Sequence, residues 1–454
     1  MSDVIGKPRR VLMLVSGFPP ARQSILRTVK FAKYLPEYGW GPVVITPAAE
    51  AAGRPEAPLL AEPRVFVRRT PRLPTLSTLV AALPRRSGIQ RVEESSTTSR
   101  AGRRLALSRV NAAIRGALAW GDTPDAFAGW IPFAVATGWR LARSCRAAAI
   151  HASGPPFSVV CAGAILSRLT GLPLVADFRD AWTLDPSDPF GTLAGWFSAQ
   201  LTARRVRCLR ALERWVLTSS TAVLFTSRAT RTLYLDEYPE IEKKSSIIYN
   251  GADPDDFTNE LRLPDRPTLA HVGTLHDYQR EQVEVFLRGF ARALRTRTVP
   301  PDTQLTLAGA IGLKLRVNLE AAANDLGIAS AVKIVGFVPH AQAVGWMRAS
   351  RLLLLFAGEN RYVRLSKISE YVAAGPPMLA FAPRKSETAE EVQLYGGRVL
   401  SHVSEPELEA ELALAFEAHN DVRRGPHAIE HPHPLNRRTE AQYLADILAR
   451  AVDR

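Results

Sequence analysis

The feature that most constrains the fold is a regular alternation between short apolar runs and amphipathic helical patterns. Short apolar runs bounded by turn residues are typical of buried strands in parallel sheets, and amphipathic segments between them are typical of crossover helices. One such helix is expected at 24–39. Strands are expected at 10–16, 41–47, 64–70, 147–153, 172–178, 222–227 and 245–250, and then at 268–273, 304–309, 332–337, 351–357, 377–383 and 397–401. The alternation predicts an α/β fold built from βαβ units.

A break near the middle of the chain indicates two domains. A chain of 454 residues is too long for one ordinary hydrophobic core. Residues 251–267 are rich in proline, aspartate and glycine and follow the last strand of the first half. We therefore expect two Rossmann-like domains, 1–252 and 253–435, facing each other across a cleft. The amphipathic pattern of 436–454 predicts a C-terminal helix that packs back on the first domain.

Charge and cysteine content narrow the partners and the compartment. Lysine and arginine number 58 against 44 acidic residues, a balance that favours nucleotides, nucleic acid or acidic lipid as partners. Cys145, Cys161 and Cys208 are odd in number and form no CxxC pair, which predicts neither a disulfide framework nor a zinc site. The N-terminal apolar run is too short for a signal peptide, and no stretch is long enough for a membrane span. We expect a cytoplasmic protein.

The segment 68–120 departs from the α/β pattern. It carries 11 arginines against two acids, Glu93 and Glu94, interleaved with apolar residues. One interpretation is a long surface insertion with solvated arginines. The other is a basic amphipathic surface for anionic lipid or for a pyrophosphate-linked acceptor, which would make the protein peripheral on the inner membrane face.

A short helix near the end of the chain places a lysine in an unusual position. Within 364–383, Ser366 is the expected N-cap and Gly375 the expected stop, so Lys367 falls in the first turn. A cation there faces the positive end of the helix dipole, which costs about 0.3 to 1 kcal/mol unless an anion compensates. Glu370 is three residues on, so a simple surface ion pair is one explanation. A bound phosphate at the carboxyl edge of the sheet is the other.

A second basic element accompanies this helix. Residues 271–281 run from a strand through Gly273 into a loop and then into a helix beginning near Arg280. Glycine permits close backbone approach, and an arginine fork suits phosphate. Two anion sites at strand ends of one domain predict that the ligand is a diphosphate.

Five segments in the same order carry a resemblance to a known family. Residues 367–383 resemble the Lys-x-x-Glu-Tyr-Leu-Ala-Ala-Gly segment of family 4-like GT-B glycosyltransferases, and 249–257 resemble their Asn-Gly-Val-Asp hinge. Residues 176–182 resemble an Asp-Phe-Arg-Asp-Pro-Trp signature of bacterial polysaccharide members. Residues 151–158 resemble the segment that typically precedes this signature. Residues 17–47 resemble the first βαβ unit of that family.

This resemblance implies a retaining transferase that takes a sugar from a nucleotide diphosphate to an acceptor hydroxyl, for a cell-surface polysaccharide or glycoconjugate. It implies neither a cofactor nor an obligatory metal; the nucleotide-sugar is a substrate. We also expect an acceptor that is linked to a lipid and held near the membrane by the segment 68–120. The implied roles are diphosphate binding by Gly273, Thr274, Arg280 and Lys367, ribose binding by Glu370, base binding by Phe337 and Val338, and catalysis or donor-sugar contact by Asp180, Arg179 and Gly17.

Three positions differ from the family pattern. Tyr362 stands where many relatives have a glutamate, and Thr274 stands where many have an arginine. Arg179 stands where related enzymes have a histidine near the cleft. Asp180 is the candidate for positioning or activating the acceptor hydroxyl. The alternative is that Asp180 pairs with a neighbouring arginine and fixes a loop.

Other functions fit parts of the sequence. A nucleotide-sugar 2-epimerase or a pseudo-glycosyltransferase shares the fold, and a basic nucleic-acid or membrane-binding protein without catalysis would share the charge. No recognised nucleic-acid motif accompanies the arginines, so we expect no nucleic-acid partner. His427 and His431 are four apart, but the prolines around them argue against a metal-binding helix. Without a Gly-x-Gly-x-x-Gly or Walker lysine motif, a dehydrogenase and a P-loop enzyme are disfavoured.

Overall fold

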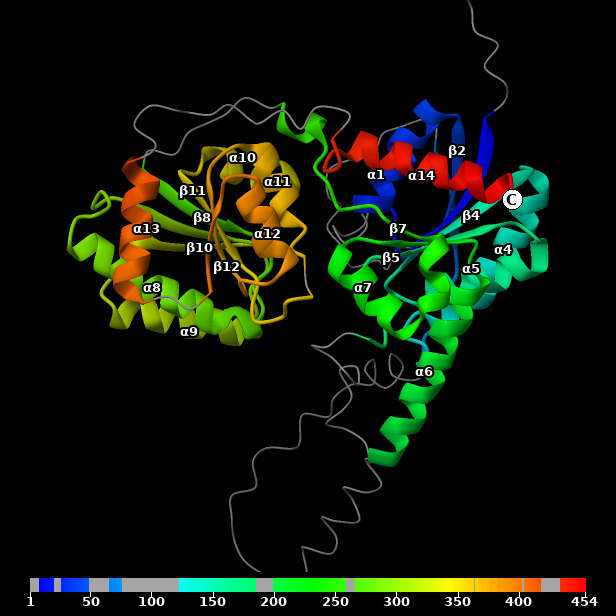
Figure 1. The fold of residues 1–454 in the computed structure, drawn as a ribbon, viewed down its shortest axis with the longest axis horizontal. Helices are drawn as coiled ribbons and strands as arrows, with labels where there is room; N and C mark the ends of the chain where they lie inside the picture. The colour runs from blue at the N-terminus through cyan, green and yellow to red at the C-terminus, as the bar shows by residue number, and fades with distance from the viewer. Residues whose placement is uncertain are drawn as a thin grey trace, which may run out of the picture. The chain divides into compact units, whose positions relative to one another are not determined.

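The structure is a computed structural model that describes residues 8–19, 26–48, 65–75, 122–184, 199–258, 266–362, 364–401, 404–417 and 433–454. Most of the arginine-rich segment 68–120 lies outside the described residues. The chain divides into two compact units (Figure 1). Unit 1 comprises 1–226, 231–247 and 442–454, and unit 2 comprises 227–230 and 248–441.

Unit 1 is built on a sheet of seven strands. Its strands are β1 Arg9–Leu14, β2 Trp40–Pro47, β3 Phe66–Thr70, β4 Ala147–Gly154, β5 Leu174–Phe178, β6 Ala222–Phe225 and β7 Ser245–Ile247. They run in the order β3-β2-β1-β4-β5-β6-β7, and every neighbouring pair is parallel. All seven strands predicted for the first half are confirmed.

Helices flank this sheet. They are α1 Leu26–Tyr34, α4 Ile131–Ser144, α5 Ser158–Thr170, α6 Ala199–Ser219, most of α7 Arg228–Glu237, and the later residues of α14 Arg437–Val452. The helix predicted over 24–39 is shorter than expected, because the α-helix ends at Tyr34 and the chain continues as a 3₁₀ turn over Leu35–Tyr38. Pro36 within that turn cannot supply an α-helical N–H, and Gly39 closes it at φ 79°.

Unit 2 repeats the scheme with six strands. The strands are β8 Thr268–Val272, β9 Gln304–Ala308, β10 Val332–Gly336, β11 Leu352–Phe356, β12 Met378–Phe381 and β13 Arg398–Leu400. The helices are α8 Arg280–Arg295, α9 Leu313–Asp325, α10 His340–Ala349, α11 Lys367–Ala374, α12 Glu387–Leu394 and α13 Glu405–Glu417. The sheet order is β10-β9-β8-β11-β12-β13, again parallel throughout.

Both sheets contain the doubly wound order 3-2-1-4-5-6, to which unit 1 adds β7 as a seventh strand. The winding direction therefore reverses between β1 and β4 in unit 1 and between β8 and β11 in unit 2. At such a reversal the connections leave the two central strands on opposite faces of the sheet. Doubly wound folds bind ligands at the carboxyl ends of these two strands. The fold thus points to the segments after β8 and β11 and after β1 and β4.

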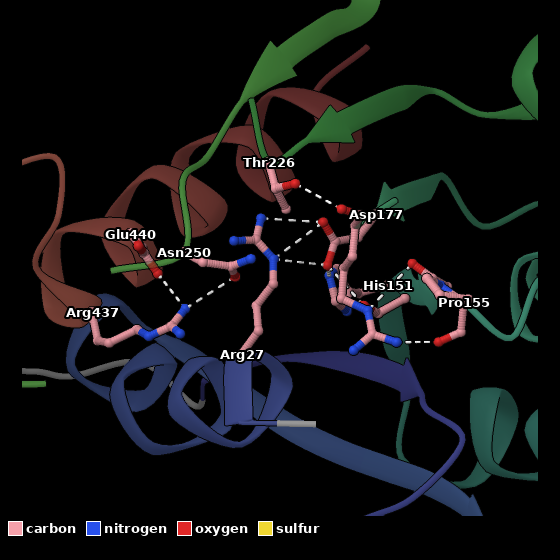
Figure 2. A network of polar contacts seen from close by, with 11 residues as sticks. Arg27, His151, Pro155, Asp177, Thr226, Asn250, Arg437 and Glu440 are labelled. Atoms are coloured by element: carbon pink, nitrogen blue, oxygen red, sulfur yellow. Dashed lines mark hydrogen bonds and ion pairs between the residues drawn. The ribbon is translucent and has the colours of Figure 1, made fainter. Parts of the chain in front are cut away.

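A buried ion pair ties three elements of unit 1 together, as Figure 2 shows. Arg27 of α1 donates to the carboxylate of Asp177 on β5 at 3.0 and 3.1 Å, and the Ser153 hydroxyl of β4 donates to it at 2.8 Å. The two charged side chains are 2% and 0% exposed. Burial favours a neutral acid, but the charge of Arg27 keeps the pKa of Asp177 below its usual value.

We predict that Arg27→Met lowers the free energy of unfolding by about 3 to 5 kcal/mol, because it leaves the Asp177 carboxylate buried without its partner. Urea denaturation measures this loss. The matched control is Arg214→Met, which breaks an exposed pair with Glu240 at 3.0 Å and should cost less than about 1 kcal/mol. Equal losses in the two variants would contradict a stabilising role for the buried pair.

Candidate functional site

The loop that follows β8 is held tightly at the carboxyl edge of the unit 2 sheet. Gly273 N–H donates to the Ala308 carbonyl at 2.8 Å, and Gly309 N–H donates to the Gly336 carbonyl at 2.8 Å. Gly309 has φ 144°, and a Cβ added to it would lie 1.8 Å from the Gly273 carbonyl oxygen. Only glycine therefore fits at position 309, and its absent side chain lets the loops after β8 and β9 meet.

Helix α11 is anchored at the same edge by its tyrosine. The Tyr371 hydroxyl accepts a hydrogen bond from Val272 N–H at 2.8 Å and donates to the Leu354 carbonyl at 3.3 Å. It thereby joins α11 to both β8 and β11, the strands between which the winding reverses. Burial raises the pKa of Tyr371, so the hydroxyl stays protonated and can make both bonds.

The first turn of α11 differs from the prediction in one respect. The helix runs from Lys367 to Ala374 and ends at Gly375 with φ 101°, as predicted. Ser366 stands at the N-cap position, as predicted, but its side chain makes no capping hydrogen bond. The Ser369 hydroxyl instead fastens the turn to the Asn250 carbonyl at 2.6 Å.

Lys367 and Glu370 form an ion pair in the first turn. Their side chains are 27% and 15% exposed, so the pair is less exposed than the surface pair considered from the sequence. The Glu370 carboxylate also lies 3.6 Å from Nε2 of His340, whose Nδ1 lies 3.8 Å from the Asp256 carboxylate. Burial would raise the pKa of Glu370, but Lys367 and His340 outweigh it and hold the pKa well below its usual range.

His271 is a candidate site residue that sequence reasoning missed. Its ring is buried on β8, and Nδ1 lies 3.0 Å from the Leu354 carbonyl. Among the described residues, Nε2 has no hydrogen-bond partner of good geometry. A Cβ placed on Gly273 would lie 3.4 Å from this nitrogen and 3.8 Å from Cγ of Lys367. His271, Gly273 and Lys367 therefore converge on one place.

The pKa of His271 is lowered to about 4, because burial disfavours the imidazolium and the charge of Lys367 adds to this effect. The ring is therefore neutral near pH 7, with Nδ1–H donating to Leu354 and Nε2 left as an acceptor. The backbone of Thr274 also acts on this ring, so His271 is tied to the same loop as Gly273.

Arg280 has a competing partner on its own helix. Arg280 begins α8 as predicted, but its exposed guanidinium lies 3.6 Å from Glu284, one turn along the same helix. Thr274 is exposed beside Gly273. The diphosphate contacts of Arg280 and Thr274 stay predictions.

The predicted base-binding residues follow β10. Gly336 ends that strand with φ 79° and turns the chain. Phe337 is then 62% exposed, whereas Val338 is only 7% exposed and packs in the core. An aromatic ring that is exposed at the carboxyl edge of a sheet is available for stacking on a planar ligand.

In unit 1, Arg179 is engaged by backbone. Its side chain donates to the Gly154 carbonyl at 3.3 Å and to the Pro155 carbonyl (Figure 2). Asp180 is exposed, and its charge opposes the lowering of the Arg179 pKa by burial. Gly17 is half-buried after β1. Arg179 thus holds the turn after β4, and Asp180 is the more accessible of the two.

A buried glutamate, also missed from the sequence, supports the segment after Asp180. The Glu213 carboxylate of α6 accepts from Thr183 N–H at 3.2 Å and from the Tyr238 hydroxyl at 3.2 Å, and it contacts the hydroxyls of Thr183 and Tyr234. Burial raises the pKa of Glu213, against the effect of these donors. Glu213 therefore fixes the chain that leaves the carboxyl end of β5.

Metal ligands and membrane spans are absent from the described part of the chain. No group of three or more His, Cys, Asp or Glu side chains is placed to hold an ion there. His427 and His431 lie outside the described residues. None of the described helices is long and apolar enough to cross a membrane.

Comparison with known proteins identifies the fold and the class. Residues 97–256 match the family model of Glycosyltransferase Family 4. HepE of Anabaena in complex with UDP-glucose is similar over 98% of both chains, with 16% identity and a TM-score of 0.56. WaaG, a glycosyltransferase of lipopolysaccharide biosynthesis, is similar over 98% of both chains, with 16% identity and a TM-score of 0.52. No curated protein matches the sequence significantly.

A third similar structure is of a protein named as a different kind of enzyme. A putative UDP-N-acetylglucosamine 2-epimerase of Listeria monocytogenes is similar over 96% of this chain and 95% of its own, with 11% identity and a TM-score of 0.54. At such identities the likeness establishes the GT-B fold, and the family match adds the glycosyltransferase class.

We predict that Gly309→Ala displaces the Gly273 loop and destabilises unit 2 by about 1 to 3 kcal/mol, because the new Cβ collides with backbone at a positive φ. Thermal unfolding measures the change. Gly345→Ala is the control, since Gly345 lies in α10 with nothing within 4 Å of an added Cβ. The control should be neutral or stabilising by up to about 1 kcal/mol. A Gly309→Ala variant as stable as the control would refute the close packing of the two loops.

We also predict that the His271 imidazole is neutral at pH 5.5, where an unperturbed histidine is mostly protonated. NMR of ring-labelled histidine, assigned with His271→Asn, reads the charge directly. The folded pKa of about 4 lies below the unfolded value of about 6.5, so the unfolded state binds a proton first as pH falls. The contribution of this group to the free energy of unfolding therefore decreases as pH falls from about 6.5 to 4. A ring that is already charged at pH 5.5 would contradict the burial described above.

Proposed function

Because the chain is a glycosyltransferase of GT-B fold, we propose that it transfers a sugar from a nucleotide-diphosphate donor to an acceptor hydroxyl with retention of configuration. The observation that carries the donor site is the convergence of Lys367, Glu370 and His271 around Gly273, where the winding of the unit 2 sheet reverses. A cation at a helix start and a close backbone approach are what a diphosphate needs.

Each residue has a proposed role in this reaction. Lys367, Gly273 and Thr274 bind the diphosphate, joined by Arg280 once its guanidinium leaves Glu284. Glu370, ionised and held by His340, accepts hydrogen bonds from the ribose hydroxyls. The exposed ring of Phe337 packs on the base with Val338 beneath it.

The chemistry follows from charge. As the bond between the anomeric carbon and the diphosphate breaks, negative charge grows on the leaving oxygens, and the cations at their side stabilise it without a metal. Asp180 orients the acceptor hydroxyl or accepts its proton, and Gly17 lies beside the donor sugar. Arg179 positions this region through the backbone carbonyls that it binds.

UDP is the proposed nucleotide, because HepE is similar in fold and binds UDP-glucose. We further propose an acceptor of cell-surface polysaccharide or glycoconjugate synthesis, linked to lipid, and a cytoplasmic location with peripheral contact to the inner membrane face through 68–120. A thermal-shift screen of UDP, GDP, ADP and TDP and their sugars tests the base, since the best-bound nucleotide stabilises the folded state most.

The likeness to the Listeria protein keeps 2-epimerisation as a second candidate on the same fold. Product analysis separates the two reactions. A transferase releases nucleoside diphosphate only when an acceptor or water takes the sugar, whereas an epimerase returns a donor with an altered sugar and intact diphosphate.

We predict that Lys367→Ala weakens UDP binding by at least about 1 kcal/mol and leaves uridine binding unchanged, because the lysine contacts only the diphosphate. Glu370→Gln should weaken both ligands, since both carry the ribose. Isothermal titration calorimetry measures the four affinities. Lys314→Ala, at an exposed position on α9, controls for the lost charge.

Arg280→Ala should likewise weaken UDP by about 1 kcal/mol. Its matched control is Arg316→Ala, because Arg316 forms the same kind of pair with Glu320 four residues on. Unchanged UDP binding in both Lys367→Ala and Arg280→Ala would sink the donor-site assignment.

A further inference from the structure

A basic cavity lies at the opposite edge of the unit 1 sheet from its strand carboxyl ends. The cavity has a volume of about 240 Å³ and opens between the amino ends of β6 and β7, the 3₁₀ turn Pro239–Lys244 and the end of α14. Its polar lining is Thr221, Lys243, Lys244, Ser246, Arg450 and Arg454. Four of these side chains are cations, and none is a carboxylate.

Two of the acids near the cavity have partners of their own. Glu240, the acid whose charge acts on Lys244, lies 3.0 Å from Arg214, and Asp453 lies 3.5 Å from Arg9. Among the described residues, Lys243, Arg450 and Arg454 have no ion pair within 4.0 Å. Like charges around a confined space repel one another, so this arrangement favours an anion in the cavity.

One cation is already oriented by the backbone. Lys244 Nζ donates to the carbonyls of Thr218 and Ser220 at 3.0 and 2.9 Å, which satisfies the end of α6. An ammonium has three donors, so a third remains for a ligand. The hydroxyls of Thr221 and Ser246 add neutral donors on the same wall.

We propose that this cavity binds a diphosphate or phosphomonoester group, separately from the nucleotide site in unit 2. The volume lies below the range of about 300 to 1,000 Å³ that holds drug-sized ligands, so the cavity suits a phosphate-bearing group and not a whole nucleotide. The group belongs either to a free phosphorylated molecule or to the head of an anionic lipid.

Binding there has a structural consequence. Residues 437–441 of α14 belong to unit 2, and residues 442–454 belong to unit 1. An anion held by Arg450 on one side and Lys243 on the other fastens the end of α14 to the unit 1 sheet. Bound anion therefore stabilises the return of the chain from the second unit to the first.

Calorimetric titration with inorganic pyrophosphate tests the site, in a Lys367→Ala background to weaken binding at the nucleotide site. We expect Lys243→Ala/Arg450→Ala to weaken pyrophosphate about tenfold or more, and Arg450→Lys to weaken it less. Arg140→Ala removes an exposed arginine of α4 and is the control. UDP affinity, measured with Lys367 intact, should not change in the double variant, which separates this site from the proposed donor site.

Vesicle sedimentation distinguishes the two sources of phosphate. Vesicles with phosphatidic acid should lose binding in the double variant if the ligand is a lipid head, and phosphatidylcholine vesicles are the blank. Hydrogen exchange of 442–454 should slow with whichever ligand binds. The proposal is overturned if the double variant binds both pyrophosphate and phosphatidic acid vesicles as tightly as its parent, or if the parent binds neither.

Discussion

The candidate site in unit 2 depends on one hydroxyl. The Tyr371 phenol bridges the N–H of Val272 on β8 and the carbonyl of Leu354 on β11. The winding of the sheet reverses between these two strands, so the segments that follow them leave on opposite faces. The Tyr371 hydroxyl bonds one backbone group of each strand near this point. Because Tyr371 fixes α11 there, the position of Lys367 and Glu370 follows from the packing of a single buried ring.

The electrostatics of α11 explain why a lysine is tolerated in its first turn. In the absence of ligand, Glu370 offsets Lys367 against the helix dipole. His340 approaches the other side of the same carboxylate at 3.6 Å and is itself close to Asp256. A diphosphate that takes Lys367 therefore leaves Glu370 with a remaining partner, free to bind hydroxyls without becoming an isolated buried charge. Under the proposed function, the i, i+3 pair is the unliganded state of the site that binds the diphosphate.

Local patterns predicted the elements well, because most strands are apolar runs with turn residues at their ends; the arginine-bearing strand β3 is an exception. Helix α11 was predicted from its stop at Gly375 and its apolar face. Ser366 stands at the predicted N-cap position without a side-chain capping hydrogen bond, and the Ser369 hydroxyl fastens the turn to the Asn250 carbonyl instead. Arg280 was assigned to the ligand from its position and its guanidinium fork, and the i, i+4 spacing to Glu284, which makes that carboxylate a competing partner, was not weighed.

The sequence did not reveal the roles of residues whose contacts are with distant parts of the chain. Arg27 and Asp177 are 150 positions apart, and an arginine in an amphipathic helix reads as exposed. His271 already lies two residues from Gly273 in the sequence, but only the tertiary fold brings Lys367 to the same place and His340 to Glu370. In each case the missing information was the tertiary pairing and not the local conformation.

The measurement that tests the account most directly is hydrogen–deuterium exchange with and without UDP. The account predicts that UDP slows exchange at 272–276, after β8, and at 366–372, at the start of α11, because these segments enclose the diphosphate. Protection confined to unit 1, or binding of UDP with unchanged exchange in both segments, would contradict it.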